Sequence, residues 1–321
     1  MTLNSDQPKT SIVIPVYNGA LSIERLVDEL IAQLSIIFRI EIVLINDCSP
    51  DNSENICIEI TKKHPDFVSF FSLAMNVGEH NAVMAGLNKA TGDYAIIIDD
   101  DFQNPVSEVK KVISYMASHD YDVVYTWYKV KKHSFFRNLG SRFNDKIANL
   151  MLKKPKNLYL SSFKIINRFL IDEVIKYNLP YPYIDGLILR TTSNIGKVEV
   201  SHNIRENGKS NYTLRKLISL WMNMFTNFSI LPLRVSIFIG FIFSIIGFLI
   251  GIYAVMEKIQ NPHIPLGYTF LVVIISIYAG VQLIAIGMVG EYLGRIFMAN
   301  NKKPQYSIRK SFNERTTDGQ K

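Results

Sequence analysis

Short apolar runs alternate with amphipathic stretches through the N-terminal half of the chain. Ser11 to Val16 is rich in β-branched residues and ends in the turn sequence Tyr17-Asn18-Gly19, which predicts a strand. The apolar residues that follow recur at helical spacing: Leu21, Leu26, Leu30, Ile31 and Leu34. The same alternation predicts strands at 41–45, 68–73, 94–98 and 122–127, and helices at 52–64, at 82–89, from about 105, and at 143–152. Strands that alternate with helices favour a parallel, doubly wound sheet, so we expect an α/β domain.

Two long uncharged segments follow near the C-terminus. Val235 to Met256 contains 22 residues without a charge, which would span about 33 Å as a helix, the thickness of a bilayer core. Leu266 to Gly290 is a second such segment, and together they predict a transmembrane hairpin. Lysines and arginines flank the outer ends of the two segments, whereas the link between them carries only Lys258. The positive-inside rule therefore predicts that both termini are cytoplasmic.

The segment before the first span admits two interpretations. Its apolar residues form a stripe beside Arg215 and Lys216: Leu214, Leu217, Ile218, Trp221, Met222 and Phe225. Such a stripe is typical of a helix lying in the membrane interface, and also of an ordinary helix facing a core. Within the spans, glycines at 247, 251, 287, 290 and 294 would let helices approach closely.

Composition and charge narrow the classes of protein. The chain has 321 residues, 48% of them hydrophobic and 20% charged, which excludes an intrinsically disordered protein. The net charge of +7 fits a nucleic-acid binder, an anionic membrane surface or a phosphorylated substrate. Because the basic residues cluster near the spans, anionic lipid accounts for them without a nucleic acid. The polar segment from Met1 to Thr10 does not have the pattern of a cleavable signal, and two cysteines give neither a disulfide framework nor a zinc site.

Polar residues follow the predicted strands. In doubly wound sheets, ligands bind beyond the carboxyl ends of the strands, where the sequence places Asn18, Asp47, Asn76 and the run 99–101. The first turn lacks the glycine pattern of a dinucleotide site. Asp47 closes its strand and is a candidate acceptor of a hydrogen bond from a nucleobase or ribose.

The run Asp99-Asp100-Asp101-Phe102-Gln103 is the strongest chemical signal. Asp99 and Asp101 are two residues apart, so both can face one cation while Asp100 points elsewhere, and Gln103 adds another oxygen. Oxygen ligands of this kind suit Mg²⁺ or Mn²⁺ with a phosphate completing the shell. The alternative is a solvated acidic turn that caps the helix after it.

At these positions the chain resembles a known family. The segments SIVIPVYN, INDCSPDN, NVGEHNAVMAGL, TGDYAIIIDDDFQNP and GEYLGRIF resemble family 2 glycosyltransferases of the A-type fold. More narrowly, they resemble the membrane-anchored polyprenyl-phosphate glycosyltransferases, such as undecaprenyl-phosphate aminoarabinose and glucosyl transferases and dolichol-phosphate mannose synthase. The resemblance implies a Rossmann-like A-type domain with a mostly parallel sheet, followed by the two-helix hairpin.

The resemblance also implies roles for individual residues. The nucleotide sugar would be held by Pro15, Tyr17, Asn18, Asp47, Asn76, Gly78, Ala82, Asp99, Asp100, Ser210 and Tyr212. The metal would be held by Asp99, Asp101 and Gln103, and the acceptor phosphate by Lys129, Lys131, Arg137 and Ser141. Asp99, Asp101, Arg137 and Arg205 would form the catalytic set, with Arg205 in a loop that closes over the diphosphate.

The implied reaction is inverting transfer of a sugar from a nucleotide sugar to undecaprenyl phosphate, which gives a lipid-linked sugar for cell-envelope glycan or lipopolysaccharide modification. The donor is expected to be UDP-linked, with GDP left open, and the cofactor Mg²⁺ or Mn²⁺. Expected partners are membrane lipid, a further copy of the chain through the spans, and a downstream flippase. The expected location is the bacterial inner membrane, crossed by both spans, with the catalytic domain in the cytoplasm.

Two alternatives and several departures accompany this interpretation. A non-catalytic scaffold could retain the fold, and a processive polysaccharide synthase shares the early motifs, but the Gln-x-x-Arg-Trp motif of such synthases is missing. The chain departs from the family pattern at 157–162, at Tyr128 and at Asn211, which leaves the sugar open.

These patterns divide the chain into four parts. They are a cytoplasmic glycosyltransferase domain at 1–212, an interfacial region at 213–232, two transmembrane helices within 233–294 (about 235–256 and 266–290), and a basic cytoplasmic tail at 295–321.

Overall fold

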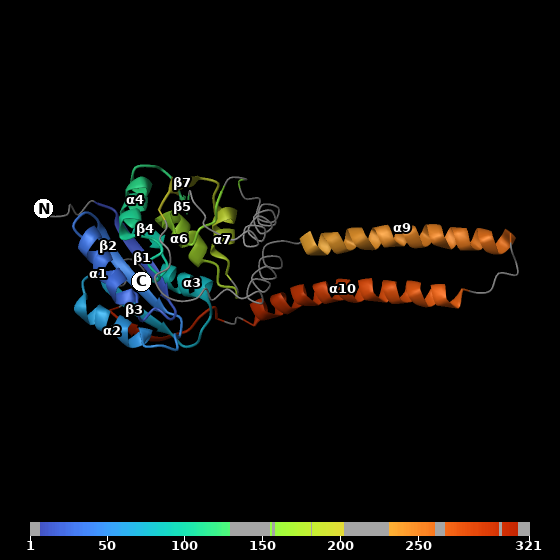
Figure 1. Ribbon diagram of the computed structural model, residues 1–321, viewed down its shortest axis with the longest axis horizontal. Helices are drawn as coiled ribbons and strands as arrows, with labels where there is room; N and C mark the ends of the chain where they lie inside the picture. Colours follow the sequence, from blue (N-terminus) through green and yellow to red (C-terminus); the bar gives the residue numbers. More distant parts are fainter. Residues whose placement is uncertain are drawn as a thin grey trace. The chain divides into compact units, whose positions relative to one another are not determined.

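The computed structural model describes residues 7–128, 155, 158–180, 182–201, 231–260, 267–301 and 304–313. The chain separates into two compact units, one made of 1–212 together with 304–321 and the other of 213–303 (Figure 1). The segment after the second long helix therefore belongs to the same unit as the N-terminal residues.

The first unit is built on one eight-stranded mixed sheet with the strand order β7-β5-β6-β4-β1-β2-β3-β8. The strands are β1 (Lys9–Val16), β2 (Arg39–Asn46), β3 (Val68–Leu73), β4 (Tyr94–Ile97), β5 (Val123–Trp127), β6 (Lys164–Asn167), β7 (Ile195–Glu199) and β8 (Ile308–Phe312). Strands β4, β1, β2 and β3 are parallel neighbours, as are β5 and β7. Strand β6 is antiparallel to β4 and β5, and β8 is antiparallel to β3.

Helices cover both faces of this sheet (Figure 1). They are α1 (Ile23–Leu34), α2 (Ser53–Lys63), α3 (Glu79–Lys89), α4 (Val106–Ala117), α6 (Arg168–Ile175) and α7 (Ile184–Thr191). Helices α1, α2 and α4 share one core cluster, and α3 contacts α6, which contacts α7. In α1 the buried residues Ile23, Leu26, Val27, Leu30 and Leu34 lie at helical spacing, so the helix forms because one stripe can be removed from water.

The second unit contains two long apolar helices, α9 (Leu231–Gln260) and α10 (Tyr268–Asn300). By length and composition, both are long and apolar enough to cross a membrane. They run side by side (Figure 1). The Ser236 hydroxyl lies 3.5 Å from the Met288 sulfur. The five span glycines do not make this contact, because a Cβ built on any of them meets no atom within 4 Å in the described part of the chain.

The sequence predictions are confirmed for the first five strands, for the helices at 52–64 and 82–89, for the helix after Pro105 and for the two long apolar helices. Most ends shift by four residues or fewer, but the second long helix continues past the expected end at Gly290 to Asn300. One expectation needs correction. Leu21 is 84% exposed and precedes α1, so it is not part of that helix. The expected mostly parallel sheet is confirmed, with β6 and β8 as its antiparallel strands. The predicted helix at 143–152 and the predicted interfacial helix lie outside the described residues.

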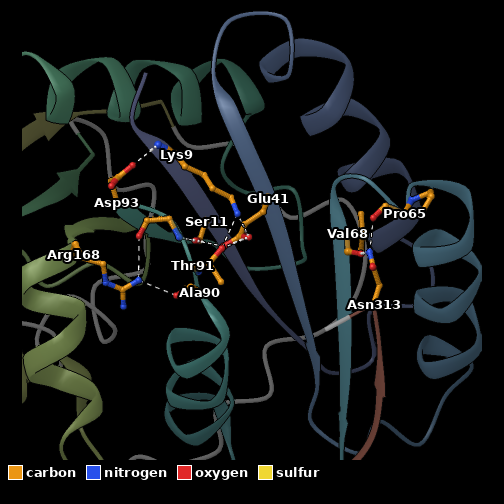
Figure 2. Close-up of polar contacts among 11 residues, drawn as sticks. Lys9, Ser11, Glu41, Pro65, Val68, Ala90, Thr91, Asp93, Arg168 and Asn313 are labelled. Atoms are coloured by element: carbon orange, nitrogen blue, oxygen red, sulfur yellow. Dashed lines mark hydrogen bonds and ion pairs between the residues drawn. The ribbon is translucent and has the colours of Figure 1, made fainter. Parts of the chain in front are cut away.

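A buried carboxylate secures the amino ends of β1 and β2, at the edge of the sheet where no sequence signal predicted a site (Figure 2). Glu41 is 1% exposed and accepts hydrogen bonds from Ser11 Oγ at 2.5 Å, Thr91 N at 2.7 Å and Thr91 Oγ1 at 2.7 Å. Lys9 Nζ forms an ion pair with it at 2.6 Å. Arg168 donates to the carbonyls of Ala90 and Gly92 on the neighbouring turn. Because these partners satisfy both oxygens of Glu41, the cluster is structural.

Candidate active site

Three turns at the opposite edge of the sheet carry strained backbone. The residues Asn18, Cys48 and Phe102 follow β1, β2 and β4 and have φ of 59°, 51° and 59°. Left-handed backbone is uncommon for residues other than glycine and costs energy, most of all for a bulky residue such as Phe102. Phe102 is 8% exposed, and the guanidinium of Arg25 lies 4.5 Å from the centroid of its ring, so packing holds the turn in place. Because β4, β1 and β2 are neighbours, the three turns line one edge.

Asp47 at the end of β2 holds the loop before α3. Its carboxylate accepts from Val77 N at 2.8 Å and from Gly78 N at 2.9 Å, and it is 4% exposed. Gly78 has φ of 88°, which favours glycine at that position. Burial raises the pKa of Asp47, although the two backbone hydrogen bonds oppose the rise. The structure thus gives Asp47 a loop-positioning role that its sequence position did not reveal, while Asn76 donates to its carbonyl at 3.3 Å.

The turns after β1 and β2 are joined by hydroxyl and carboxylate groups. Asn18 N donates to Ser49 Oγ at 2.8 Å, and Ser49 Oγ donates to Asp51 Oδ1 at 2.6 Å. Asp51 also accepts from Ala20 N at 3.1 Å and from Ser53 N at 3.1 Å. Desolvation would raise the pKa of Asp51, but these hydrogen bonds outweigh it and lower the pKa. Asp51 therefore joins the turn after β1 to the first residue of α2.

The acidic run separates into side chains with different partners. Asp99 Oδ2 accepts from Ser162 Oγ at 2.8 Å, and Asp101 Oδ1 accepts from Gln103 N at 3.1 Å. Asp100 is 9% exposed, and its Oδ2 accepts from Tyr17 N at 3.3 Å, so it points to the turn after β1. The expectation that Asp100 points away from its two neighbours is consistent with these partners.

Asp99 lies in an electrostatically unfavourable environment. Desolvation, then the charges of Glu79 and Asp101, raise its pKa to about 7. Neighbouring carboxylates that destabilise each other in this way are stabilised by a bound cation, and their oxygens are the ligands that hard divalent cations prefer. In the described part of the chain no three His, Cys, Asp or Glu side chains gather as a metal site, so a cation bound between Asp99 and Asp101 would need other oxygens to complete its shell.

A buried ion pair acts on Asp99, because the charge of Lys164 lowers the pKa of Asp99. Lys164, 3% exposed in β6, forms an ion pair with Asp185 in the first turn of α7, and Tyr125 OH donates to the same oxygen of Asp185 at 2.9 Å. The ring of His80 packs edge-on against Tyr183 at 5.2 Å. Desolvation lowers the pKa of His80 to about 4, so its ring is neutral near pH 7. The sequence analysis did not identify Lys164; the signal that could have found it is a lysine among the apolar residues Phe163, Ile165 and Ile166.

The described residues gather much of the expected nucleotide side at one edge of the sheet. Tyr17 and Asn18 are exposed beside Asp47 and Asp100, Pro15 is half-buried in β1, and Ala82 is fully buried in α3. The expected acceptor and loop residues lie outside the described residues: Lys129, Lys131, Arg137, Ser141, Arg205, Ser210 and Tyr212.

Comparison with known proteins places this geometry in a family. Residues 11–175 match the family described as Glycosyl transferase family 2. The chain is 30% identical over 313 residues to an undecaprenyl-phosphate 4-deoxy-4-formamido-L-arabinose transferase of Yersinia pestis (strain Pestoides F), covering 97% of this chain and 95% of the relative. It is 31% identical over 309 residues to the protein of the same name from Proteus mirabilis (strain HI4320), covering 94% and 93%.

Solved structures share the fold of the first unit. Mannosyl-3-phosphoglycerate synthase from Rubrobacter xylanophilus superposes with a TM-score of 0.53 at 17% identity, over 67% of this chain and 71% of that one. Glucosyl-3-phosphoglycerate synthase from Mycobacterium tuberculosis, in complex with Mn²⁺, UDP and phosphoglyceric acid, gives a TM-score of 0.50 at 17% identity, over 66% and 74%. With its strand-end turns and mixed sheet, the chain is an A-type glycosyltransferase that belongs to glycosyltransferase family 2.

Proposed function

We propose that this glycosyltransferase moves a sugar from a UDP-sugar to undecaprenyl phosphate at the cytoplasmic face of the bacterial inner membrane. The single observation that carries the proposal is the acidic end of β4 beside the turns of β1 and β2, in a chain that continues into two long apolar helices. Similarity to undecaprenyl-phosphate sugar transferases over almost the whole chain supports the lipid acceptor. The product would be a lipid-linked sugar for cell-envelope glycan or lipopolysaccharide modification.

The donor end uses the described turns. Asn18, Asp47 and Asn76 would contact the nucleoside, together with Tyr17, which is 38% exposed and precedes Asn18. Asp99, Asp101 and Gln103 would hold Mg²⁺ or Mn²⁺, which when bound neutralises the diphosphate of the donor. The Mn²⁺ and UDP in the mycobacterial enzyme support a divalent cation and a uridine donor. The relatives make 4-deoxy-4-formamido-L-arabinose the first sugar to test.

The acceptor end requires no protein base. A phosphate monoester has its second pKa near 6, so the lipid phosphate is mostly dianionic near neutral pH and is already a nucleophile. The protein then has to bring two anions together. Lys129, Lys131, Arg137 and Ser141 would bind the acceptor phosphate, while Arg205, Ser210 and Tyr212 would cover the departing nucleoside diphosphate. Attack opposite the leaving group inverts the anomeric carbon.

The membrane part of the proposal follows from the acceptor, because a polyprenyl phosphate stays in the bilayer. We assign the parts of α9 and α10 that fall within 233–294 to the membrane, region 213–232 to the interface, and the catalytic domain and both termini to the cytoplasm. Further copies of the chain packed through the spans, and a flippase that takes the product, belong to the same proposal.

A transfer assay with purified full-length protein tests the proposal. The protein is incubated with undecaprenyl phosphate, Mg²⁺ or Mn²⁺, and a panel of radiolabelled UDP- and GDP-sugars that includes UDP-4-deoxy-4-formamido-L-arabinose. We expect label in the organic phase from one donor. Asp101→Ala should abolish it, whereas Asp93→Ala, which removes the same charge beside the other end of β4, should leave most of it.

Two results would contradict the proposal in different ways. If the protein binds UDP and metal but no donor gives labelled lipid, either undecaprenyl phosphate is not the acceptor or the donor is not in the panel. Protein that binds neither would favour the non-catalytic scaffold.

A further inference from the structure

The chain returns to the catalytic sheet after α10. Strand β8 pairs antiparallel with β3 at the edge of the sheet, and Ala74 N donates to Ser307 O at 2.8 Å. The rings of Phe70 and Phe312 stack with centroids 6.0 Å apart. Beyond the strand, the Asn313 amide donates to the carbonyls of Pro65 and Val68 (Figure 2). Residues 304–313, which we call the C-terminal clasp, are therefore part of the catalytic unit, although the two apolar helices precede them in the sequence.

Lys310 lies opposite Ser72 of β3, next to a β-bulge. Ser72 pairs with Lys310 and Leu73 pairs with Ile308, so Arg309 is the extra residue in β8. Bulges re-aim side chains at sheet edges. The Lys310 ammonium forms an ion pair with Glu54 in the first turn of α2, and Ser72 Oγ donates to the other oxygen of Glu54 at 2.8 Å.

From Ser72, hydrogen bonds continue to the turns at the carboxyl ends of β1 and β2. Asn46 Nδ2 donates to Ser72 Oγ at 3.1 Å, and Asn46 Oδ1 accepts from Ser49 N at 3.2 Å. Ser49 Oγ then accepts from Asn18 N at 2.8 Å. An unbroken series of polar contacts thus links Lys310 to Asn18, a residue of the proposed nucleotide side.

The middle of this series is buried. Ser72 is 1% exposed and Asn46 is 0% exposed. Water cannot replace a hydrogen bond that either side chain loses, so losing one is costly. Buried networks in which every member is satisfied fix side-chain geometry. The hydrogen bond from Lys310 is the largest influence on Glu54 and lowers its pKa, so Glu54 is an ionised acceptor near neutral pH. Among the side-chain contacts of the described residues, the path from the Lys310 ammonium to the turns runs through Glu54, Ser72 and Asn46.

We propose that the C-terminal clasp positions the nucleotide-binding turns, with Lys310 acting through Glu54, Ser72 and Asn46 on Ser49 and Asn18. Lys310 is a positioning residue in this account and does not touch the donor. The inference rests on the proposed function only for the identity of the ligand, UDP, that reports on the turns.

The test is a double-mutant cycle on the full-length protein, with UDP in the presence of Mn²⁺ as the probe. Lys310→Ala should weaken UDP affinity about two- to fivefold, the range expected for a partly exposed ion pair. Ser72→Ala removes the middle link and should weaken it about fivefold or more. The double variant should be no weaker than Ser72→Ala alone, because the effect of Lys310 passes through Ser72.

Two control variants separate positioning from charge and from stability. Arg309→Ala removes one positive charge from the residue next to Lys310. The charge of Arg309 also lowers the pKa of Glu54, but the variant should leave UDP affinity unchanged. Lys310→Arg keeps the ion pair with Glu54 and should retain the UDP affinity of the wild type. In transfer assays, Lys310→Ala should raise the donor KM at unchanged kcat, and its thermal midpoint should match that of Arg309→Ala.

Hydrogen exchange provides a readout that needs no ligand. Lys310→Ala should speed exchange of the Ser49 and Asn18 amides and leave the amides of β1 unchanged. Additive effects in the cycle, or unchanged exchange at Ser49, would overturn the inference. If the wild type does not bind UDP, the donor assignment fails, and the exchange result alone decides whether the clasp positions these turns.

Discussion

The carboxylates of the catalytic unit are held by different kinds of partner at the two ends of the strands. Asp100 accepts from a backbone amide in the turn after β1, whereas Glu41 is surrounded by a lysine and two hydroxyls at the amino ends of β1 and β2. The contact of Asp100 requires a glycine at position 19, because a Cβ there would collide with its carboxylate. The contacts of Glu41 require its carboxylate to be ionised. The two sites therefore predict different responses to a single substitution.

Gly19→Ala should disrupt the turn after β1. A Cβ at this position would lie 2.2 Å from Asp100 Oδ2 and 3.1 Å from Val16 Cγ1, so the carboxylate must move. Overpacking of this kind costs about 1–3 kcal/mol, and displaced Asp100 would release Tyr17. We expect a lower thermal midpoint and weaker UDP binding. Gly247→Ala in α9 is the matched control, since its Cβ meets no atom within 4 Å; equal behaviour of the two variants would contradict the packing argument.

Glu41→Gln should reduce stability in a pH-dependent way. Desolvation raises the pKa of Glu41, but hydrogen bonds from Lys9, Ser11 and Thr91 outweigh it, so the folded-state pKa lies below the ordinary value of 4.5. A depressed pKa stabilises the fold above 4.5, and the contribution is lost as the pH falls through the folded-state pKa. The variant should therefore lose about 1–3 kcal/mol near pH 7, and the difference from wild type should shrink in acid.

Thermal unfolding followed by circular dichroism across this pH range measures the effect. Glu29→Gln, an exposed carboxylate that pairs with Arg25 on α1, should change little at any pH. If the stability difference between Glu41→Gln and the wild type stays constant down to the most acidic pH, the shape of the side chain and not its charge matters at this position.

At the scale of elements, the loop between β3 and α3 depends on a residue from another strand. In the wild type, each oxygen of Asp47 accepts from one backbone amide, that of Val77 or that of Gly78. Asp47→Asn replaces one of these oxygens by an NH₂ group, which cannot accept, so one of the two amides loses its partner. Losing one such bond costs about 1–3 kcal/mol, so UDP affinity should fall tenfold or more. Hydrogen exchange of the Gly78 amide should be faster in this variant. An unchanged exchange rate would show that Asp47 does not hold the loop in place.

The same scale shows which elements the sequence predicts. Strands β1 to β4 are predicted because their apolar runs are nearly continuous and end in turn residues, and the two apolar helices because they lack charge over a bilayer's thickness. Strand β6 is missed because it is short and contains Lys164, whose charge is neutralised by Asp185 from a distant helix. Strand β8 is missed because Arg309 and Lys310 give it the appearance of a basic tail.

The candidate site follows the same logic. Position after a strand identifies Asn18, Asp47 and the aspartates that follow β4, since parallel strands end at a common edge. The contacts that orient them come from residues far along the chain, such as Ser162 on Asp99, and no local pattern encodes them. The two loop amides bound by Asp47 belong to the same class of long-range contact.

At the scale of the whole molecule, the proposed membrane orientation predicts on which side of the membrane each cysteine can be labelled. Cys48 lies exposed in the turn after β2, whereas Cys57 is 0% exposed, and burial raises the pKa of its thiol. A membrane-impermeant maleimide should label Cys48 only after spheroplasts are opened. In a Cys48→Ser background, Gln260→Cys at the end of α9 should be labelled in intact spheroplasts. Labelling in the reverse order would overturn the topology.

The most direct test of the central claim is the identity of both products of one turnover. Sugar transfer to a lipid phosphate breaks the bond between the anomeric carbon and the diphosphate oxygen, so it releases UDP and forms an undecaprenyl monophosphate sugar. We predict UDP and this lipid in equal amounts by mass spectrometry, with inverted anomeric configuration. Release of UMP with a lipid diphosphate sugar, or UDP without any lipid product, would contradict the account.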